Sequence, residues 1–253
     1  MRRILITGAS GGLAQALIAL LDQDQLFLVG RSKERLDQVY GNHPHIHTFE
    51  VDICQKESVQ RLVETIEDGY GPLDILINTA GYGFYQNFEE FSASDIQDMF
   101  AVNTFASMYF CQALAPYMKR RKKGHLINVV SISGLVATAQ SSLYSSTKFA
   151  MIGFSNAIRQ ELAPYHVYVT SINTGPVATS FFDLADPDGS YQQSVRPFML
   201  QTDQVARDIK SILGKSVREV NRPRNLALAV KFQQLFPSLS DFFYRKFFNF
   251  KSK

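Results

Sequence analysis

The chain has 253 residues, a formal net charge of +3 and 45% hydrophobic residues. This length suits one well-buried α/β domain and is too short for two large ones. The ordinary composition excludes a repeat protein and a disordered chain, and the sequence contains no run of about eighteen apolar residues that would span a bilayer.

The two cysteines, Cys54 and Cys111, fall in different predicted elements and lack the spacing of a metal site. We therefore expect reduced structural thiols, no bound metal and a cytoplasmic location. Met1-Arg2-Arg3 and the apolar residues after it imitate a signal peptide. Because the same segment has the pattern of a strand, a glycine turn and a helix, we expect no cleavage there.

The N-terminal segment has the pattern of a dinucleotide-binding turn. Arg3-Ile4-Leu5-Ile6 is an apolar run typical of a buried strand, and residues 12–20 have helical spacing. Glycines between such elements let the backbone approach a pyrophosphate, which then rests on the helix N-terminus. The residues that would form this site are Gly8, Ser10, Gly11, Gly12 and Leu13.

Strands and helices alternate along the rest of the chain, which predicts a doubly wound parallel sheet of Rossmann type in a single α/β domain. Strands are expected at 3–7, 26–30, 46–51, 73–78, 125–130 and 167–172, with a seventh at 217–221. Helices are expected at 12–20, 32–39, 56–68, 93–98, 103–122, 142–163 and 203–213, and Gly124 is expected to end the fifth of them.

The end of the second predicted strand bears on the choice of cofactor. Enzymes of this fold that use NAD place an acid there, whereas this chain has Gly30, followed by Arg31 and Ser32. A guanidinium binds a 2′-phosphate bidentately, so the pattern favours NADP, with NAD as the alternative. Ser10 and Gly11 weigh against NADP, because the glycine turn offers no basic residue.

The run from Lys119 to Lys123 falls in the last turn of the predicted fifth helix. Cations are favourable at that end of a helix. We assign them this structural role and expect no nucleic-acid binding, although a basic patch is the alternative.

Tyr144 and Lys148 lie four residues apart in the helix predicted over 142–163, so both side chains rise from one face. A free tyrosine has a pKa of about 10, and a neighbouring ammonium favours the phenolate and is expected to lower that pKa toward neutrality. The pair would then suit a general acid/base. Such a pair is more often a buried ring beside a solvated amine, so the assignment depends on the other motifs.

The ordered motifs resemble the classical short-chain dehydrogenase/reductase (SDR) family over roughly residues 3–215. The segments that resemble the family's patterns are Thr7-Gly8-x-x-x-Gly12, Asn78-Thr79-Ala80-Gly81, Asn103, Ser131 and Tyr144-x-x-x-Lys148. Ala14, Thr79 and Thr174 depart from the usual Gly, Asn and Pro, and none of these changes removes a reacting group.

The resemblance implies hydride transfer between a nicotinamide and a carbonyl or alcohol, with reduction favoured. Tyr144 would move the proton, and Lys148 would lower its pKa and hold the ribose. Ser131 would donate to the substrate oxygen, and Asn103 would anchor a water that links Lys148 to solvent. Ser133, eleven residues before Tyr144, is the rival for the serine role.

The resemblance also implies cofactor contacts beyond the glycine turn. The Asp52 carboxylate would accept from the adenine amine, and the Val177 backbone and Thr179 hydroxyl would lie near the nicotinamide amide and the pyrophosphate. The full expected cofactor set is Gly8, Ser10, Gly11, Gly12, Leu13, Arg31, Ser32, Asp52, Ile53, Asn78, Ala80, Gly81, Tyr144, Lys148, Gly175, Val177 and Thr179.

Residues 180–200 contain the turn Asp186-Pro-Asp-Gly189 and have poor periodicity, which predicts a long substrate loop of the lid type. Aromatic side chains on and near it would make the pocket, and hence the substrate, apolar. Core or subunit packing explains the same aromatics equally well. The expected substrate residues are Ser131, Tyr144, Tyr82, Phe84, Leu135, Phe181 and Phe182.

Residues 223–253 are expected to form a basic, Phe-rich helical extension to a catalytic domain at 1–222. Residues 215–253 hold nine Lys or Arg and two acids, a charge of +7, whereas the first 214 residues carry −4. Leu239, Phe243, Phe247 and Phe250 recur at near-helical spacing. Such a helix lies on an anionic membrane or packs against the body or a partner subunit, and the packed alternative is favoured.

The sequence therefore predicts an NADP-preferring reductase of apolar carbonyls. The alternatives are an NAD-dependent dehydrogenase of a lipid-like alcohol and a sensor or scaffold that binds the cofactor without turnover. The four polar residues Asn103, Ser131, Tyr144 and Lys148 argue against the last. The resemblance implies a homodimer or homotetramer that associates through the helices at 103–122 and 142–163.

Overall fold

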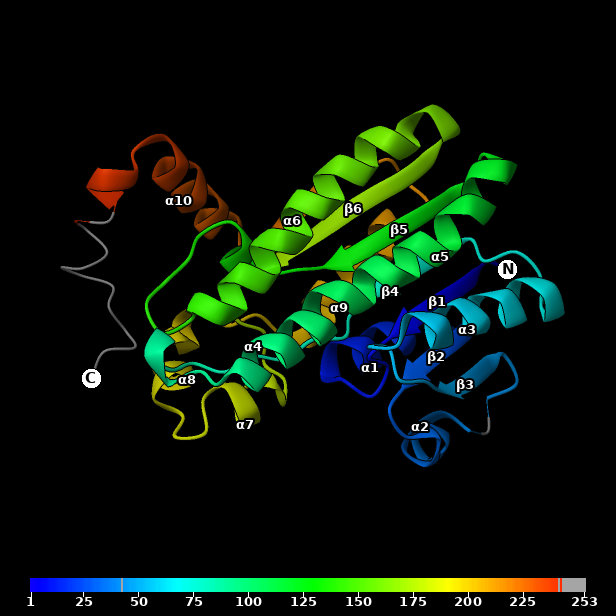
Figure 1. Ribbon diagram of the computed structural model, residues 1–253, viewed down its shortest axis with the longest axis horizontal. Coiled ribbons are helices and arrows are strands. Elements are labelled where there is room, and N and C mark those ends of the chain that lie inside the picture. Colours follow the sequence, from blue (N-terminus) through cyan, green and yellow to red (C-terminus); the bar gives the residue numbers. More distant parts are fainter. Residues whose placement is uncertain (42, 241, 243–253) are drawn as a thin grey trace.

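The computed structural model describes residues 1–41, 43–240 and 242, and a parallel sheet runs through the middle of the molecule (Figure 1). The seven strands lie in the order β3-β2-β1-β4-β5-β6-β7. The order reverses beside β1, and ligands of such sheets bind outside the carboxyl ends of the strands at this point. The strands are β1 Arg3–Thr7, β2 Gln25–Gly30, β3 Ile46–Glu50, β4 Ile75–Asn78, β5 Gly124–Val129, β6 Val167–Thr174 and β7 Glu219–Arg222.

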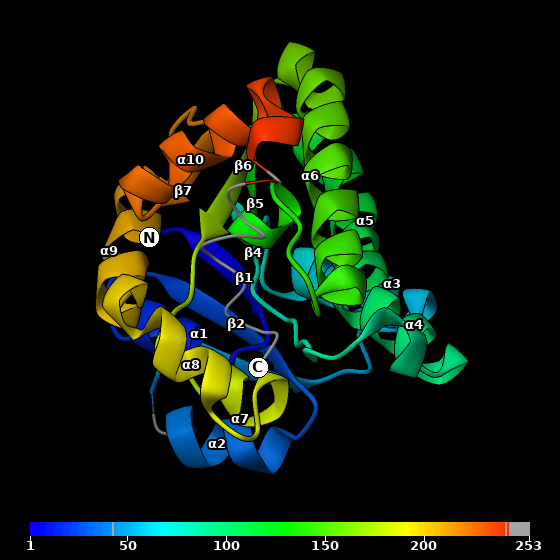
Figure 2. The ribbon, with the colours of Figure 1, turned by 90° about the vertical axis from the view of Figure 1, so that its left-hand side faces the viewer.

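Helices cover both faces of the sheet, as Figure 2 shows from the end of the molecule. Alternate residues of each strand point to opposite faces, so Ile4 and Ile6 pack on α1 (Gly12–Ile18) and α9 (Thr202–Ile212). Leu5 packs instead with α3 (Lys56–Gly69), α5 (Ala106–Arg121) and α6 (Ser142–Leu162). The remaining α-helices are α2 Lys33–Tyr40, α4 Ala93–Phe100, α7 Phe181–Ala185, α8 Ser190–Val195 and α10 Arg224–Leu235. The predicted doubly wound α/β sheet is confirmed.

The predicted gap between the fourth and fifth helices is wrong. A π-helical segment, Ala101–Phe105, joins α4 directly to α5. The predicted role of Gly124 is also wrong, because α5 ends at Arg121 with Lys122 in the left-handed conformation and Gly124 opens β5. A Cβ built on Gly124 would lie 2.2 Å from Met118 Sδ, so close packing on α5 accounts for the glycine.

Residues 180–200 are not one long loop as predicted, although their role at the substrate stays a prediction. The segment folds into α7, α8 and a 3-10 turn, Arg196–Phe198. The Asp186 carboxylate accepts from the backbone N–H groups of Tyr191 and Gln192, at 3.2 and 2.6 Å, and so caps α8. Helices this short depend on such tertiary contacts, which a periodicity search does not detect.

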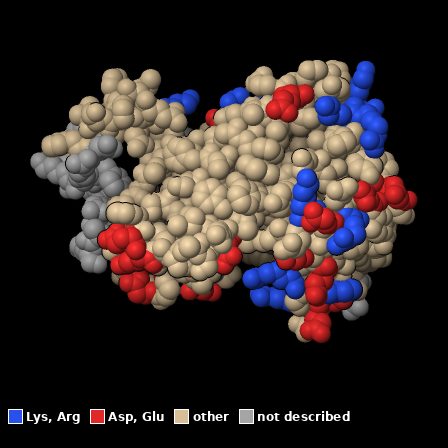
Figure 3. All heavy atoms as spheres, viewed as in Figure 1, with Lys and Arg blue, Asp and Glu red and all other residues tan. Residues whose placement is uncertain are grey.

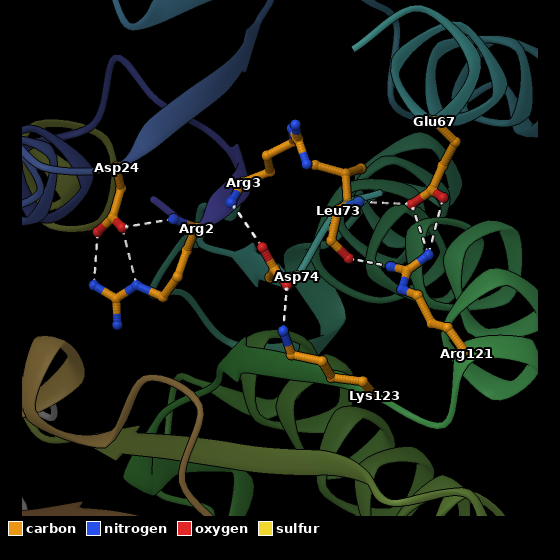
Figure 4. Close-up of polar contacts among 8 residues, drawn as sticks. All are labelled: Arg2, Arg3, Asp24, Glu67, Leu73, Asp74, Arg121 and Lys123. Atoms are coloured by element: carbon orange, nitrogen blue, oxygen red, sulfur yellow. Dashed lines mark hydrogen bonds and ion pairs between the residues drawn. The ribbon is translucent and has the colours of Figure 1, made fainter. Parts of the chain in front are cut away.

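Ion pairs connect charged residues near the amino ends of the strands (Figure 4). Arg121 pairs with Glu67 at 2.9 Å, and Lys123 pairs with Asp74 at 3.2 Å. Lys119 lies over the Tyr165 ring at 4.4 Å and Arg120 over the Tyr117 ring at 4.6 Å. These four cations of the basic run thus contact groups of their own chain, and Lys119, Arg120 and Arg121 stand in the last turn of α5 as predicted.

His125 is buried beneath the loop that leads to β7. Its Nδ1 accepts from Gly214 N at 3.1 Å, and its Nε2 lies 2.8 Å from Thr170 Oγ1. Thr170 Oγ1 in turn donates to the Val217 carbonyl, so His125 Nε2 must carry the proton that Thr170 accepts. Burial lowers the pKa of His125 to about 4.

We expect this histidine to make the protein acid-sensitive. Above the unfolded-state pKa of about 6.5, the His125 imidazole is neutral in both the folded and the unfolded protein. Below that pKa it is protonated in the unfolded chain but stays neutral in the folded one. The free energy of unfolding should fall through this range, with a loss from His125 of about 2 kcal/mol at pH 5. Urea unfolding at pH 7.5 and 5 checks this: His125→Asn should be less stable at pH 7.5 but lose less on acidification. An identical loss in both proteins would contradict it.

Along the described residues, no helix is long and apolar enough to cross a membrane. The first part of the predicted helical extension at 223–253 is present as α10. Of the predicted tail, Phe243, Phe247 and Phe250 lie outside the described residues.

Candidate active site

Helix α6 brings Tyr144 and Lys148 together at the carboxyl end of the sheet. Both side chains are buried, with Tyr144 7% and Lys148 5% exposed. Lys148 Nζ lies 5.6 Å from the centroid of the Tyr144 ring. A buried ammonium beside a buried phenol departs from the ordinary arrangement of a solvated lysine.

The electrostatics differ from the sequence-based prediction. Burial raises the pKa of Tyr144 to about 12, although a hydrogen bond with Ser131 lowers it in part. Burial likewise lowers the pKa of Lys148 to about 8. The prediction that Lys148 brings the tyrosine pKa toward neutrality is wrong for these side chains by themselves, because the loss of water on burial is the largest effect on the Tyr144 pKa.

Ser131 is the serine that the fold places against the Tyr144 hydroxyl. It caps the short turn Ile132–Gly134, where its Oγ accepts from Ser133 N at 3.0 Å and lies 3.3 Å from the Thr174 carbonyl. Ser133 takes part here through its backbone N–H. The geometry therefore favours Ser131 over its rival.

Asn103 lies in the π-helical segment and is 1% exposed. Its Oδ1 accepts from Tyr82 N at 2.9 Å, and its Nδ2 donates to the Tyr82 carbonyl at 2.8 Å and to Thr147 Oγ1 at 3.1 Å. Asn103 thus ties the segment after β4 to the helix that carries Tyr144. Sequence reasoning missed Thr147, for which the only signal was its place one turn after Tyr144. The role of Asn103 as a water anchor stays a prediction.

Two glycines that sequence reasoning missed also shape the site. A Cβ on Gly83 would lie 2.8 Å from Tyr144 Cδ2 and 3.1 Å from Phe181 Cζ. A Cβ on Gly134 would lie 2.7 Å from the Lys148 carbonyl oxygen. The backbones at Gly83 and Gly134 therefore pack closely against the Tyr144–Lys148 segment. The only signal for these two positions in the sequence was a glycine in a polar or aromatic loop.

The glycine turn after β1 has the shape of an anion cradle. Gly8 has a φ of +65°, and a Cβ there would lie 2.8 Å from Ala80 Cα, so only glycine fits. Gly11 stands at the N-cap of α1, no side chain of the described residues caps that helix, and its first turn holds no acid. Thr179 lies beside the turn, with its Cγ2 3.3 Å from the Cβ position of Gly12. Ser10 and Leu13 belong to the same segment, and Leu13 packs into the core below it.

At the end of β2, Arg31 is exposed and Ser32 caps α2 by accepting from Arg35 N at 3.2 Å. Arg31 acts electrostatically on Tyr82, whose pKa it lowers against the dominant effect of burial. Among the residues that the structure describes, the Arg31 guanidinium makes no hydrogen bond or ion pair. The Lys33 ammonium, by contrast, is held by Asp37 at 2.5 Å.

The other expected cofactor residues surround the same end of the sheet. Asp52 follows β3 and accepts from Cys54 N at 3.0 Å, while half-buried Ile53 packs on the core. Asn78 ends β4, and a Cβ on Gly81 would lie 3.2 Å from Asn103 Oδ1 and 3.3 Å from Lys148 Nζ. Gly175 donates to the Arg222 carbonyl at 2.7 Å, and Val177 bridges to Leu200.

Aromatic side chains enclose the Tyr144 ring. The Phe181 centroid lies 5.6 Å from it and the Tyr85 centroid 6.4 Å. Phe182 contacts Phe181 and Tyr191, whereas Leu135 stands outside this group. The cluster around Met99, Leu143 and Tyr144 includes Tyr82, Phe84, Tyr85, Phe91, Phe100 and Phe181. A backbone hydrogen bond from Tyr85 N to the Ala185 carbonyl, 3.2 Å long, holds α7 against it.

Solved structures with the same fold span nearly the whole chain. A short-chain dehydrogenase from Streptomyces avermitilis superposes with a TM-score of 0.81 at 24% identity, covering 97% of this chain and 98% of that one. ElxO with NADP bound superposes with a TM-score of 0.77 at 22% identity, covering 87% of this chain and 97% of its own.

Sequence relatives and a family model identify the chain further. An uncharacterized oxidoreductase of Staphylococcus aureus (strain USA300) is 34% identical over 187 residues, which is 72% of this chain and 81% of that protein. A 3-ketodihydrosphingosine reductase of Bacteroides thetaiotaomicron is 29% identical over 230 residues, 90% of this chain and 81% of that protein. The short chain dehydrogenase family model matches residues 2–188. The chain therefore belongs to the short-chain dehydrogenase family and is an oxidoreductase that works with a nicotinamide cofactor.

Proposed function

We propose that the protein reduces an apolar aldehyde or ketone with NADPH. The observation that carries this proposal is the buried pair of Tyr144 and Lys148, with half-buried Ser131 against the tyrosine, beside the glycine turn at the switch point of the sheet. A sensor or scaffold that only binds the cofactor has no use for a buried ammonium next to a buried phenol, since burial of that charge costs stability.

The residues present fit a dinucleotide. The uncapped start of α1 and the Gly8 backbone would hold the pyrophosphate, and Asp52 would accept from the adenine. Lys148, whose Nζ faces the Gly81 backbone, would bind the nicotinamide ribose. When bound, the nicotinamide supplies the hydride, and the protein contributes orientation and charge.

We propose that Tyr144 gives the proton to the substrate oxygen. A phenol whose pKa is about 12 stays protonated throughout the physiological range, which suits a donor in the direction of reduction. Ser131, already hydrogen-bonded to Tyr144, would donate to the same oxygen as negative charge develops on it. The ammonium of Lys148 would stabilise the phenolate that the transfer leaves behind.

The preference for NADP over NAD rests on Arg31. Arg31 is exposed directly after β2 and its guanidinium is not engaged by the described residues, and position 30 lacks the acid that would repel a phosphate. The NADP bound by ElxO is consistent with this choice. NAD remains the alternative, since the turn itself carries no basic residue.

Replacing Arg31 by Ala is expected to weaken NADPH binding by about ten- to a hundredfold, the value of one charge-assisted hydrogen bond, and to leave NADH binding nearly unchanged. Lys33→Ala is the matched control, because that ammonium already pairs with Asp37. Calorimetric titration of both cofactors checks the prediction. Equal losses for NADPH and NADH would show that Arg31 has a structural role.

The aromatic enclosure of Tyr144 supports an apolar substrate. A second candidate is a ketone with a long hydrocarbon chain, favoured by the resemblance to a protein named 3-ketodihydrosphingosine reductase. The reverse reaction, NAD-dependent oxidation of a lipid-like alcohol, is the remaining alternative. A turnover screen of aldehydes, ketones and alcohols with both cofactors tests the function, and absence of turnover with every apolar carbonyl would overturn it.

For the whole chain we propose a catalytic domain at 1–222, an extension at 223–253, and a cytoplasmic location with a peripheral membrane contact through that extension. We also propose a homodimer or homotetramer that associates through α5 and α6. Ile96, Phe105 and Phe149 are 45%, 43% and 44% exposed on this side of the molecule, and burying them would favour the association.

A further inference from the structure

The C-terminal part of the described chain exposes a group of large apolar side chains, here called the C-terminal ridge. Phe232, Leu235, Phe236 and Leu239 are 44%, 73%, 53% and 48% exposed. The Phe232 and Phe236 rings lie 5.3 Å apart, so the ridge packs on itself while it stays open to solvent. Scattered apolar residues on a surface are ordinary, but contiguous ones mark a contact with another molecule.

The ridge lies at the end of the molecule where the parallel strands end, because α10 follows directly on β7. Figure 2 looks onto this end and shows α10 on one side of the strand ends and α7 and α8 on the other. Leu184 on α7 and Phe198 after α8 are also 47% and 46% exposed. A surface that covered the ridge would therefore lie at the same end of the molecule as Tyr144.

Charge indicates which surface fits. The view in Figure 3 shows largely uncharged residues over α10, with cationic side chains at the margin. Arg224 and Lys231 on α10 are exposed, and residues 215–253 carry +7 in total. A second copy would bring two equally basic segments together, whereas an anionic bilayer offers opposite charge and an apolar interior.

We propose that the C-terminal ridge docks on an anionic lipid surface and that the enzyme takes its carbonyl substrate from that surface. The exposed acids Asp183 and Asp188 belong to the α7–α8 segment, so the protein meets the bilayer obliquely, with α10 first. Only the source of the substrate rests on the proposed function; the docking does not.

Sedimentation with vesicles tests the docking on the full-length protein. Vesicles of phosphatidylcholine with phosphatidylglycerol should bind it, and vesicles of phosphatidylcholine alone should bind it at least about tenfold more weakly. Binding should weaken as salt rises, because exposed charges are screened. The double variant Leu235→Gln/Leu239→Gln should bind the anionic vesicles at least about tenfold more weakly. Val39→Gln, at a 49% exposed position on α2, is the matched control and should bind like the wild type.

Turnover separates this proposal from the proposed function. The double variant should reduce a water-soluble carbonyl as fast as the wild type and lose activity only on a long-chain ketone held in anionic vesicles. Equal binding of both vesicle types, or unchanged binding by the double variant, would overturn the docking. Self-association that the double variant abolishes would also overturn it, by showing that a second copy covers the ridge. Vesicle binding without turnover on any carbonyl would instead contradict the reductase function alone.

Discussion

Tyr144→Phe is expected to lower kcat for carbonyl reduction by about a hundred- to ten-thousandfold, the contribution of a positioned acid or base. The variant removes the proton donor but keeps the ring. The ring is 7% exposed and contacts Tyr85 and Phe181, so its packing should survive. NADPH affinity should therefore stay close to that of the wild type, and the loss should be confined to the reaction.

Stopped-flow reduction and calorimetric titration of the same preparations measure both quantities. Ser131→Ala should cost more turnover than Ser133→Ala, because Ser131 is the serine bonded to Tyr144. Lys148→Ala should lower both turnover and cofactor affinity, since two roles are proposed for it. Wild-type turnover by Tyr144→Phe on a validated substrate would refute this mechanism.

Arg121→Met is expected to lower the free energy of unfolding by about 3 kcal/mol, because it leaves a buried carboxylate without its cation. The Glu67 side chain is 6% exposed and, among the described residues, would keep the N–H of Leu73, 2.8 Å from its Oε1, as its hydrogen-bond donor. The guanidinium also donates to the Leu73 carbonyl, so the variant loses a second partner (Figure 4).

Lys123→Met is the matched control from the same basic run. Its side chain is 76% exposed, and surface pairs of this kind contribute about 0.5 kcal/mol. Urea unfolding of the two variants, followed by circular dichroism, gives the comparison. A cost for Arg121→Met no larger than for Lys123→Met would show that the Glu67 pair contributes little.

Much of the fold followed from local pattern. Strands with both faces buried, such as Ile75–Asn78, leave continuous apolar runs, and the alternation with helices determines a parallel sheet. The group around Tyr144 and Lys148 was also predictable, because helical spacing places both side chains on one face. The register of the sheet then places Thr7 beside Asn78, so the glycine turn that follows Thr7 lies next to the motif at the end of the fourth strand.

The remaining features depend on contacts between distant residues. The π-helical segment at Ala101–Phe105 positions Asn103 against Tyr82, and the periodicity of the sequence does not predict this segment. The Tyr144 pKa rises instead of falling because burial is a property of the folded chain. Gly83 matters only once the Tyr144 ring packs against it. Each of these misses is a tertiary effect that overrides a local pattern.

Deuterium transfer tests the central claim most directly. The wild-type protein is incubated with NADPH that is deuterated at the transferable position and with a panel of apolar ketones. The masses of the products are then measured by mass spectrometry. We predict an alcohol that carries one deuterium, formed faster than with deuterated NADH and not formed by Tyr144→Phe. Tight NADPH binding with no deuterated alcohol from any ketone would contradict the account and leave a protein that binds the cofactor without turnover.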